Sequence, residues 1–407
     1  MSQARHFPIM VSPKEETPSP PAKPKKVTND DLYRRSTQYR YWSFTVSKLA
    51  DLRVLANKKG LKSTHEKLDN LDPTLEETKA VTSNGLDKFP FVTPTEELQI
   101  ITYYARKCQD LANFFRLPSQ VRSTAIVYLY KFYLTHSVMA YHPQHIMYTC
   151  LFLAAKVENS FIGINNFSKA IPRTTPDSIL QYEYLILQSL RFSLRCHHPF
   201  MPLYGFYLDI QDLLPKVDLK RLTRSCDKAR EHISESLFTD VFFLFTPPQI
   251  ALSCLWKSDD ILVERYLAKK MGLKKRQIKG ELAVVKEVEK GNGVSSKSAS
   301  PDAGPAENEP NLLTPQQKFD KLMITIKKCA HAIEKNTCSP SVDEARRISS
   351  KIRYCLDPIR YGRRLVKQQK ETATVVVQAN AEQSHPSKSG ARMAESPEGP
   401  SKRVKTE

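Results

Sequence analysis

The segment PQHIMYTCLFLAAKV at residues 143–157 constrains the fold more than any other part of the chain. Pro143 suits the first position of a helix, and the residues after it are apolar on nearly every face. A helix that is apolar all round is buried among other elements rather than exposed on one side. The segment therefore predicts a central helix that other helices of the chain surround.

The same pattern returns in the second half of the chain. HPQHIMYTCLF at residues 142–152 aligns with TPPQIALSCLW at residues 246–256. Ile146 then matches Ile250, 104 residues later, and the cysteine and aromatic positions match as well. Two helical domains of about 100 residues, each built round one buried helix, would produce this repeat.

Capping signals and apolar spacing predict the helices around these two segments. Thr93, Pro94 and Glu96 form a capping box with proline at the first helical position, and apolar residues at helical spacing follow to Phe115. Further helices are expected at about 119–135, 165–171, 176–192, 259 onward, 315–335 and 341–356. We expect an all-α fold of two tandem helical units, with extra N- and C-terminal helices and disordered tails.

Shifts in composition predict the boundaries between the parts of the chain. They are a disordered N-terminal tail (1–28), an N-terminal helix region (29–60) with its helix at about 45–59, a polar linker (61–92), the first helical unit (93–195), the second unit (196–336) with a disordered insertion at about 288–313, a C-terminal helix region (337–370) and a disordered basic tail (371–407).

The charge and the cysteines narrow the class of protein. The net charge of +19 suits a nuclear protein with basic tails, and the basic residues form no single aromatic-interleaved stripe, so direct nucleic-acid binding stays open. The eight cysteines include no C-x-x-C pair, so we expect no metal site. No signal peptide or membrane-spanning run is present, and we expect an intracellular, reducing location without membrane contact.

The motifs of nucleotide-dependent and hydrolytic enzymes are missing. The sequence contains no G-x-G-x-x-G or G-x-x-x-x-G-K, and no H-R-D, D-F-G, G-x-S-x-G or H-E-x-x-H. His197 and His198 follow Cys196 after a predicted helix, but no second cluster at ligand spacing accompanies them. We therefore expect no catalytic residues, no cofactor and no metal.

The first unit resembles a cyclin box. AAKVEN (154–159) resembles the end of the third helix of the box, and QYEYLILQSLRFSL (181–194) resembles the fifth. FYLTHSVMAYHPQHIMYTCLFLAAKVEN, STQYRYWSF (36–44), LADLRVLANKK (49–59) and TPPQIAL (246–252) resemble the cyclin H branch of the cyclin family. The resemblance covers roughly residues 30–285 and implies two tandem five-helix cyclin boxes.

The resemblance implies a regulatory subunit of a kinase. Such a subunit binds and activates a cyclin-dependent kinase, here of the CDK-activating kinase and transcription factor IIH type. The implied partners are the kinase catalytic subunit, a third assembly subunit and the core of transcription factor IIH. The implied substrates are the C-terminal repeat of RNA polymerase II and the activation segments of other kinases.

The resemblance also assigns residues to the kinase interface. Lys156 and Glu183 match the paired residues that contact the kinase backbone near its αC helix. The apolar wall of the groove that receives αC is matched by Leu153, Leu187, Phe192 and Leu194. Without the resemblance, Lys156 would be a cation at a helix end, Glu183 a solvated carboxylate, and the apolar residues part of a core.

One departure from the family pattern favours a transcription-type cyclin. Cell-cycle cyclins pair an arginine of an M-R-x-x-L motif with an aspartate of the next helix, and these positions fall here at about Ile101 and Tyr130. Loss of both members avoids a stranded buried charge. Two alternatives remain: another transcription-type cyclin of the C or K type, and a TFIIB-like nucleic-acid-binding adaptor. The adaptor would need a zinc ribbon, which the cysteine spacing does not provide.

The C-terminus carries a candidate nuclear-targeting cluster. PSKRVK (400–405) places Lys402, Arg403 and Lys405 together, and PKKV (24–27) offers a second basic cluster. The alternative reading is an ordinary charged terminus. We expect a nuclear location.

Overall fold

The computed structural model describes residues 33–214, 216–273, 314–335 and 340–383. Within these ranges the regular secondary structure is helical, and no strand occurs. The predicted tail at 1–28, the predicted insertion at 288–313, and Lys402, Arg403 and Lys405 lie outside them. No helix of the described part of the chain is long and apolar enough to cross a membrane.

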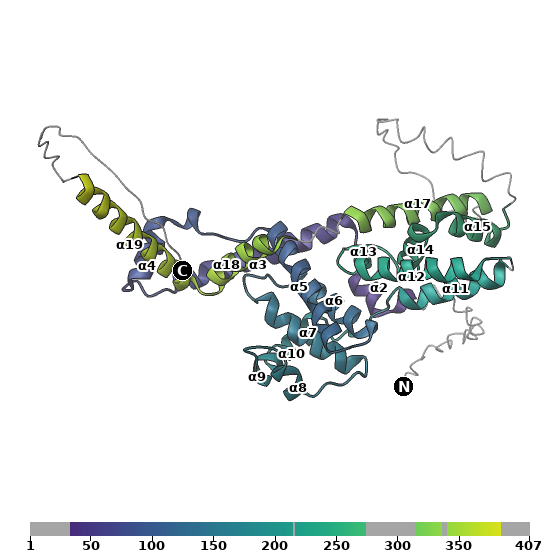
Figure 1. Ribbon diagram of the computed structural model, residues 1–407, viewed down its shortest axis with the longest axis horizontal. Helices are drawn as coiled ribbons and strands as arrows, with labels where there is room; N and C mark the ends of the chain where they lie inside the picture. The colour runs from purple at the N-terminus through teal and green to yellow at the C-terminus, as the bar shows by residue number, and fades with distance from the viewer. Residues whose placement is uncertain (1–32, 215, 274–313, 336–339, 384–407) are drawn as a thin grey trace, which may run out of the picture.

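The helices form two bundles that lie side by side (Figure 1). The first bundle consists of α5 (Pro94–Phe114), α6 (Ser119–Phe132), α7 (Pro143–Val157), α8 (Ile164–Lys169), α9 (Pro176–Leu180) and α10 (Glu183–Ser189). The second consists of α11 (Phe200–Leu213), α12 (Leu219–Ser236), α13 (Val241–Leu244), α14 (Pro247–Ser258), α15 (Asp260–Lys270) and α17 (Pro315–Lys335). The predicted all-α fold is confirmed.

The two repeated segments are the buried helices α7 and α14. Ile146 and Cys150 of α7 are fully buried, as is Cys254 of α14, and Ile250 is 2% exposed. Both helices begin with proline at the first position, and Thr246 forms a capping box with Gln249. The apolar pattern therefore identified the centre of each bundle.

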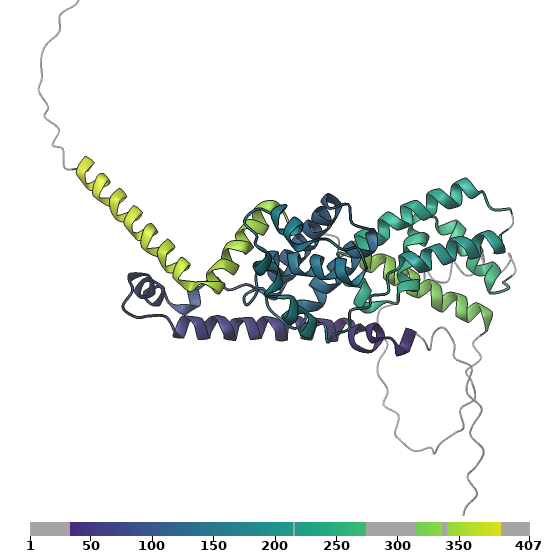
Figure 2. The ribbon, with the colours of Figure 1, turned by 90° about the horizontal axis from the view of Figure 1, so that it is seen from below.

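The terminal helices join the core of the first bundle. They are α2 (Thr37–Trp42), α3 (Val46–Asp69), α4 (Glu76–Asn84), α18 (Val342–Leu356) and α19 (Pro358–Gln383), with a short 3-10 helix at Leu86–Lys88. Trp42, Leu49 and Ile352 belong to one hydrophobic cluster with the residues of α5, α6 and α7. Figure 2 shows α3 running alongside the first bundle and α19 projecting away from it.

Three expectations about helix boundaries differ from the structure. The helix predicted at about 45–59 is α3, which continues to Asp69 with Thr64 and Leu68 still buried. The predicted linker at 61–92 therefore includes the end of α3, and it also contains α4. The predicted helix at 176–192 is divided into α9 and α10. Residues 371–383, predicted to be part of the disordered tail, belong to α19, which extends to Gln383.

Candidate functional site

Lys156 and Glu183 lie together at the surface of the first bundle. Lys156 is in the last turn of α7, and Glu183 is the first residue of α10, 27 residues later. The Lys156 ammonium donates a hydrogen bond to Glu183 Oε1, and their side chains are 35% and 21% exposed. Sequence reasoning placed Glu183 about two turns inside a longer helix, whereas it begins α10.

The local backbone favours both charges at these positions. The C-terminus of a helix carries a partial negative charge that favours a cation, and the N-terminus favours an anion. Lys156 Nζ also lies 4.8 Å from the centroid of the Phe152 ring, which adds a cation–π contact. The pair is thus held in place before any partner binds, while part of each side chain stays accessible to solvent.

The four apolar residues assigned to the same site differ in exposure. Phe192 is 62% exposed, Leu187 and Leu194 are half-buried against the first core, and Leu153 is 4% exposed. Leu153 therefore offers almost no surface to a partner and belongs to the core of the first bundle. The structure brings Lys156 and Glu183 into contact and leaves Phe192 as the open apolar group.

Phe192 also has an unusual backbone. Arg191 and Phe192 have φ values of 53° and 52°, in the left-handed region that bulky residues seldom adopt. The Phe192 amide donates to the carbonyl oxygen of Leu187 at 3.0 Å, and this turn ends the helical segment and directs the ring toward solvent. Left-handed backbone at non-glycine residues costs free energy and clusters at functional sites.

Sequence reasoning missed two exposed aromatic residues in neighbouring segments. Tyr184 follows Glu183 in α10 and is 65% exposed, and Phe161 follows α7 and is 76% exposed. Tyr184 could have been found from its place beside Glu183 in the quoted motif. No helical pattern marks Phe161, because it lies in a loop.

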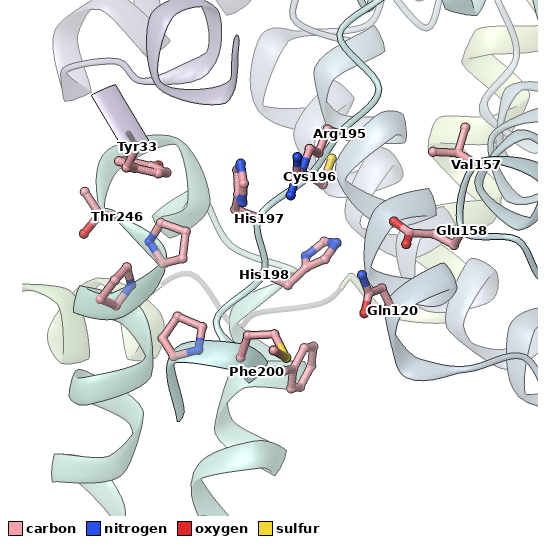
Figure 3. A pocket seen from close by; sticks show the side chains of 14 residues that line it. Tyr33, Gln120, Val157, Glu158, Arg195, Cys196, His197, His198, Phe200 and Thr246 are labelled. Atoms are coloured by element: carbon pink, nitrogen blue, oxygen red, sulfur yellow. The ribbon is translucent and has the colours of Figure 1, made fainter. Parts of the chain in front are cut away.

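A second feature is a cavity of about 780 Å³ between the two bundles (Figure 3). Tyr33 and Thr246 line one side, Gln120 and Glu158 line the other, and the segment from Arg195 to His198 runs between them. This segment is the connection between the bundles. The cavity therefore lies where each bundle contributes its own wall.

A hydrogen bond holds His198 of that connection to the first bundle. His198 Nε2 lies 2.8 Å from the hydroxyl of Thr124, which in turn donates to Glu158 at 2.7 Å. Burial lowers the pKa of His198 to about 3, so its imidazole is neutral and Nε2–H donates to Thr124. Cys196 Sγ accepts from the buried Lys131 ammonium at 3.7 Å. Among the described residues, no three histidine, cysteine or acidic side chains gather as metal ligands would.

Comparison with known families and proteins identifies both bundles. The family described as the cyclin N-terminal domain matches residues 74–195, and the cyclin C-terminal domain matches residues 198–334. Cyclin CCL1 of Saccharomyces cerevisiae is 41% identical over 251 residues, which are 60% of this chain and 63% of that protein. Cyclin mcs2 of Schizosaccharomyces pombe is 36% identical over 59% of this chain and 73% of its own length. Cyclin-H of Xenopus laevis is 31% identical over 60% and 75%, respectively.

Two solved complexes contain chains of similar structure. One is the yeast TFIIK (Kin28/Ccl1/Tfb3) complex, whose matching chain has a TM-score of 0.51 and 31% identity over 74% of this chain and 100% of its own. The other is the CAK complex of Chaetomium thermophilum bound to ATP-gamma-S, with a TM-score of 0.58 and 26% identity over 91% and 100%. With these relatives and with both of its bundles matched to cyclin domains, the chain belongs to the cyclin family.

Proposed function

We propose that the chain is the regulatory subunit of a CDK-activating kinase of the transcription factor IIH type. The observation that carries the proposal is the partly exposed Lys156–Glu183 pair on the first cyclin box, which also exposes the ring of Phe192. The similar chains come from complexes named for TFIIK and CAK, which supports the choice of partner.

The chain would act by binding one conformation of the kinase. Phosphoryl transfer by a protein kinase requires an ion pair between the β3 lysine and the αC glutamate. A subunit that binds the conformation containing this pair more tightly raises its population. Lys156 and Glu183 would hydrogen-bond to kinase backbone groups near αC, and Leu187, Phe192 and Leu194 would contact its apolar face with Leu153 beneath them. The chain itself would contribute no reacting group.

The proposal extends to further partners and substrates. A third assembly subunit would complete the kinase complex, and the complex would attach to the core of transcription factor IIH. Its substrates would be the C-terminal repeat of RNA polymerase II and the activation segments of other kinases. A nuclear location follows from these substrates and from the basic cluster at Lys402, Arg403 and Lys405.

Reconstitution tests the proposal. The purified chain is mixed with the catalytic subunit that co-purifies with it, and phosphate transfer to an RNA polymerase II repeat peptide is measured. We expect negligible transfer by either subunit alone and a large rate increase for the mixture. Calorimetry on the chain alone should detect no ATP binding. ATP binding by the chain, or a mixture no faster than the kinase alone, would contradict the proposal.

A further inference from the structure

A cationic cavity lies where the C-terminal helices meet the first cyclin box. Its volume is about 420 Å³, and its wall includes His142, His145, Tyr182, Arg353, Asp357 and Arg360. The histidines come from the start of α7, and Arg353, Asp357 and Arg360 come from the junction between α18 and α19. None of these residues takes part in the proposed contact with the kinase.

The charges that line the cavity do not balance. Asp357 is the one carboxylate among the described residues that line it, and it is already paired with Arg360, whose Nε lies 3.0 Å from Asp357 Oδ2. The guanidinium of Arg353 makes no hydrogen bond or ion pair with any other described residue. The guanidinium of Arg353 therefore lies beside two imidazoles, and no acidic side chain of the described residues is paired with it.

The histidines add hydrogen-bond donors to the same wall. His142 Nδ1 accepts from the Gln144 amide at 3.2 Å, so the proton of the neutral ring lies on Nε2 and can be donated. The rings of His142 and His145 lie 5.9 Å apart, and that of Tyr182 lies 6.4 Å from His145. Burial lowers the pKa of His142 to about 4, with smaller contributions from His145 and Arg353, so this ring is neutral.

We propose that this cavity binds the phosphate group of a phosphorylated serine or threonine in a peptide. The planar guanidinium of Arg353 matches two phosphate oxygens, and the third oxygen can accept from an imidazole. A phosphate monoester carries nearly two negative charges at neutral pH, more than a carboxylate supplies. Nucleic acid is disfavoured, because it is bound along grooves that contact many successive phosphates, whereas this cavity holds one.

The test uses the full chain and a fluorescent Ser-Pro peptide with a single phosphoserine, with binding measured by anisotropy. We expect the phosphorylated peptide to bind and the unphosphorylated peptide to bind at least about tenfold more weakly, since each charged hydrogen bond contributes a factor of this order. Arg353→Ala should weaken binding by a similar factor, and Arg353→Lys should restore part of it. Arg346→Ala, on the same helix and paired with Asp343 outside the cavity, is the matched control and should leave affinity unchanged.

Other outcomes would overturn the assignment. Equal binding of the unphosphorylated peptide, or of one with glutamate in place of phosphoserine, would show that phosphate is not recognised. Inorganic phosphate that binds as tightly as the peptide would make this a free-anion site. Equal loss of affinity in the Arg346 and Arg353 variants would show that binding depends on net charge and not on this cavity. Displacement of the peptide by single-stranded RNA of the same charge would identify nucleic acid as the ligand. Since binding is measured without a kinase, its failure leaves the proposed activation untouched.

Discussion

At the scale of single residues, the contact between Lys156 and Glu183 decides how the two side chains can meet a partner. The ion pair forms within the free chain, so both groups keep a partner when no kinase is present. A partly exposed pair contributes little to stability, because water screens it. Its larger effect is expected at an interface, where water leaves and both side chains already have the required geometry.

The first prediction concerns this pair. Lys156→Ala or Glu183→Ala should weaken kinase binding by roughly 30-fold or more, because truncation of one member of a desolvated charge pair costs about 2–5 kcal/mol. The double variant should lose less than the sum of the two, since each single change leaves the other charge without its partner. Binding titrations and thermal melts on all three variants provide the measurement. If both single variants bind as tightly as the parent, the assignment is wrong, and if they unfold, the role is structural.

The second prediction concerns Glu97, a buried carboxyl at the start of α5. It is 5% exposed and accepts a hydrogen bond from Ser137, and burial raises its pKa to about 7. Above its ordinary pKa the unfolded chain ionises while the folded chain stays protonated. Stability that is complete at low pH is therefore lost as the pH rises from about 4.5 to about 7.

Glu97→Gln should remove this loss. Between pH 5.5 and pH 8, the free energy of unfolding of the variant relative to the parent should rise by about 2 kcal/mol. Denaturant titrations of both proteins at several pH values measure this difference in free energy. The contributions of the other titrating groups cancel, because they are the same in both proteins. A difference that stays constant over this range would show that Glu97 ionises normally in the folded protein.

At the scale of elements, two helical glycines differ in whether packing requires them. A Cβ on Gly60 of α3 would lie 2.2 Å from Ser137 Oγ, so the helix packs there at a distance that only glycine allows. Gly205 of α11 is exposed, and a Cβ there would meet nothing within 4 Å. Only the first glycine is required by packing.

The third prediction compares these two positions. Gly60→Ala should destabilise the protein by about 1–3 kcal/mol, since the added methyl displaces Ser137 and its hydrogen bond to Glu97. Gly205→Ala should stabilise it by roughly 0.5–1 kcal/mol through its higher helix propensity. Thermal melts of both variants beside the parent test the pair. A Gly60 variant as stable as the parent would mean that α3 shifts easily.

Capping residues and prolines in the sequence predicted the starts of those helices that depend on neighbouring residues alone. The capping box at Thr93 and the proline at Pro143 gave the starts of α5 and α7, and both are confirmed. The signals failed where residues distant in sequence meet: α3 continues past Gly60, and that glycine packs closely against Ser137. Likewise α4 is paired with α19, where a Cβ on Gly362 would lie 2.4 Å from the Glu77 carbonyl oxygen.

For the candidate site too, the sequence named some residues, but their contacts and exposure depend on the fold. Resemblance named Lys156 and Glu183, but only the folded chain shows that they form an ion pair, since α8 and α9 separate them along the sequence. The burial of Leu153 and the exposure of Phe192 depend on tertiary packing, which apolarity alone does not reveal. The cationic cavity was missed because its histidines and arginines lie about 200 residues apart.

At the scale of the whole molecule, the N-terminal segment connects the two boxes. Arg53 of α3 forms an ion pair through both guanidinium nitrogens with Asp240, next to α13, and one of these bonds measures 2.8 Å. The Phe44 amide donates to the carbonyl oxygen of Phe243 at 2.9 Å. Tyr130 of the first box likewise donates to the Phe238 carbonyl oxygen at 3.0 Å. The first box, which carries the proposed kinase contact, is thus fixed to the second through polar contacts at several points.

The fourth prediction concerns the two ends of the chain. Lys402, Arg403 and Lys405 lie beyond the described residues, as does the PKKV cluster at 24–27, and each is a basic run of the kind that import receptors bind. A tagged chain lacking residues 400–407 should show less nuclear accumulation by microscopy, and alanines at Lys25 and Lys26 in the same chain should remove what the first cluster leaves. Deletion of Thr406 and Glu407 alone keeps the basic residues and serves as the control. If the chain without either cluster still accumulates in the nucleus as the parent does, neither terminus directs import, and entry depends on the folded region or on a bound partner.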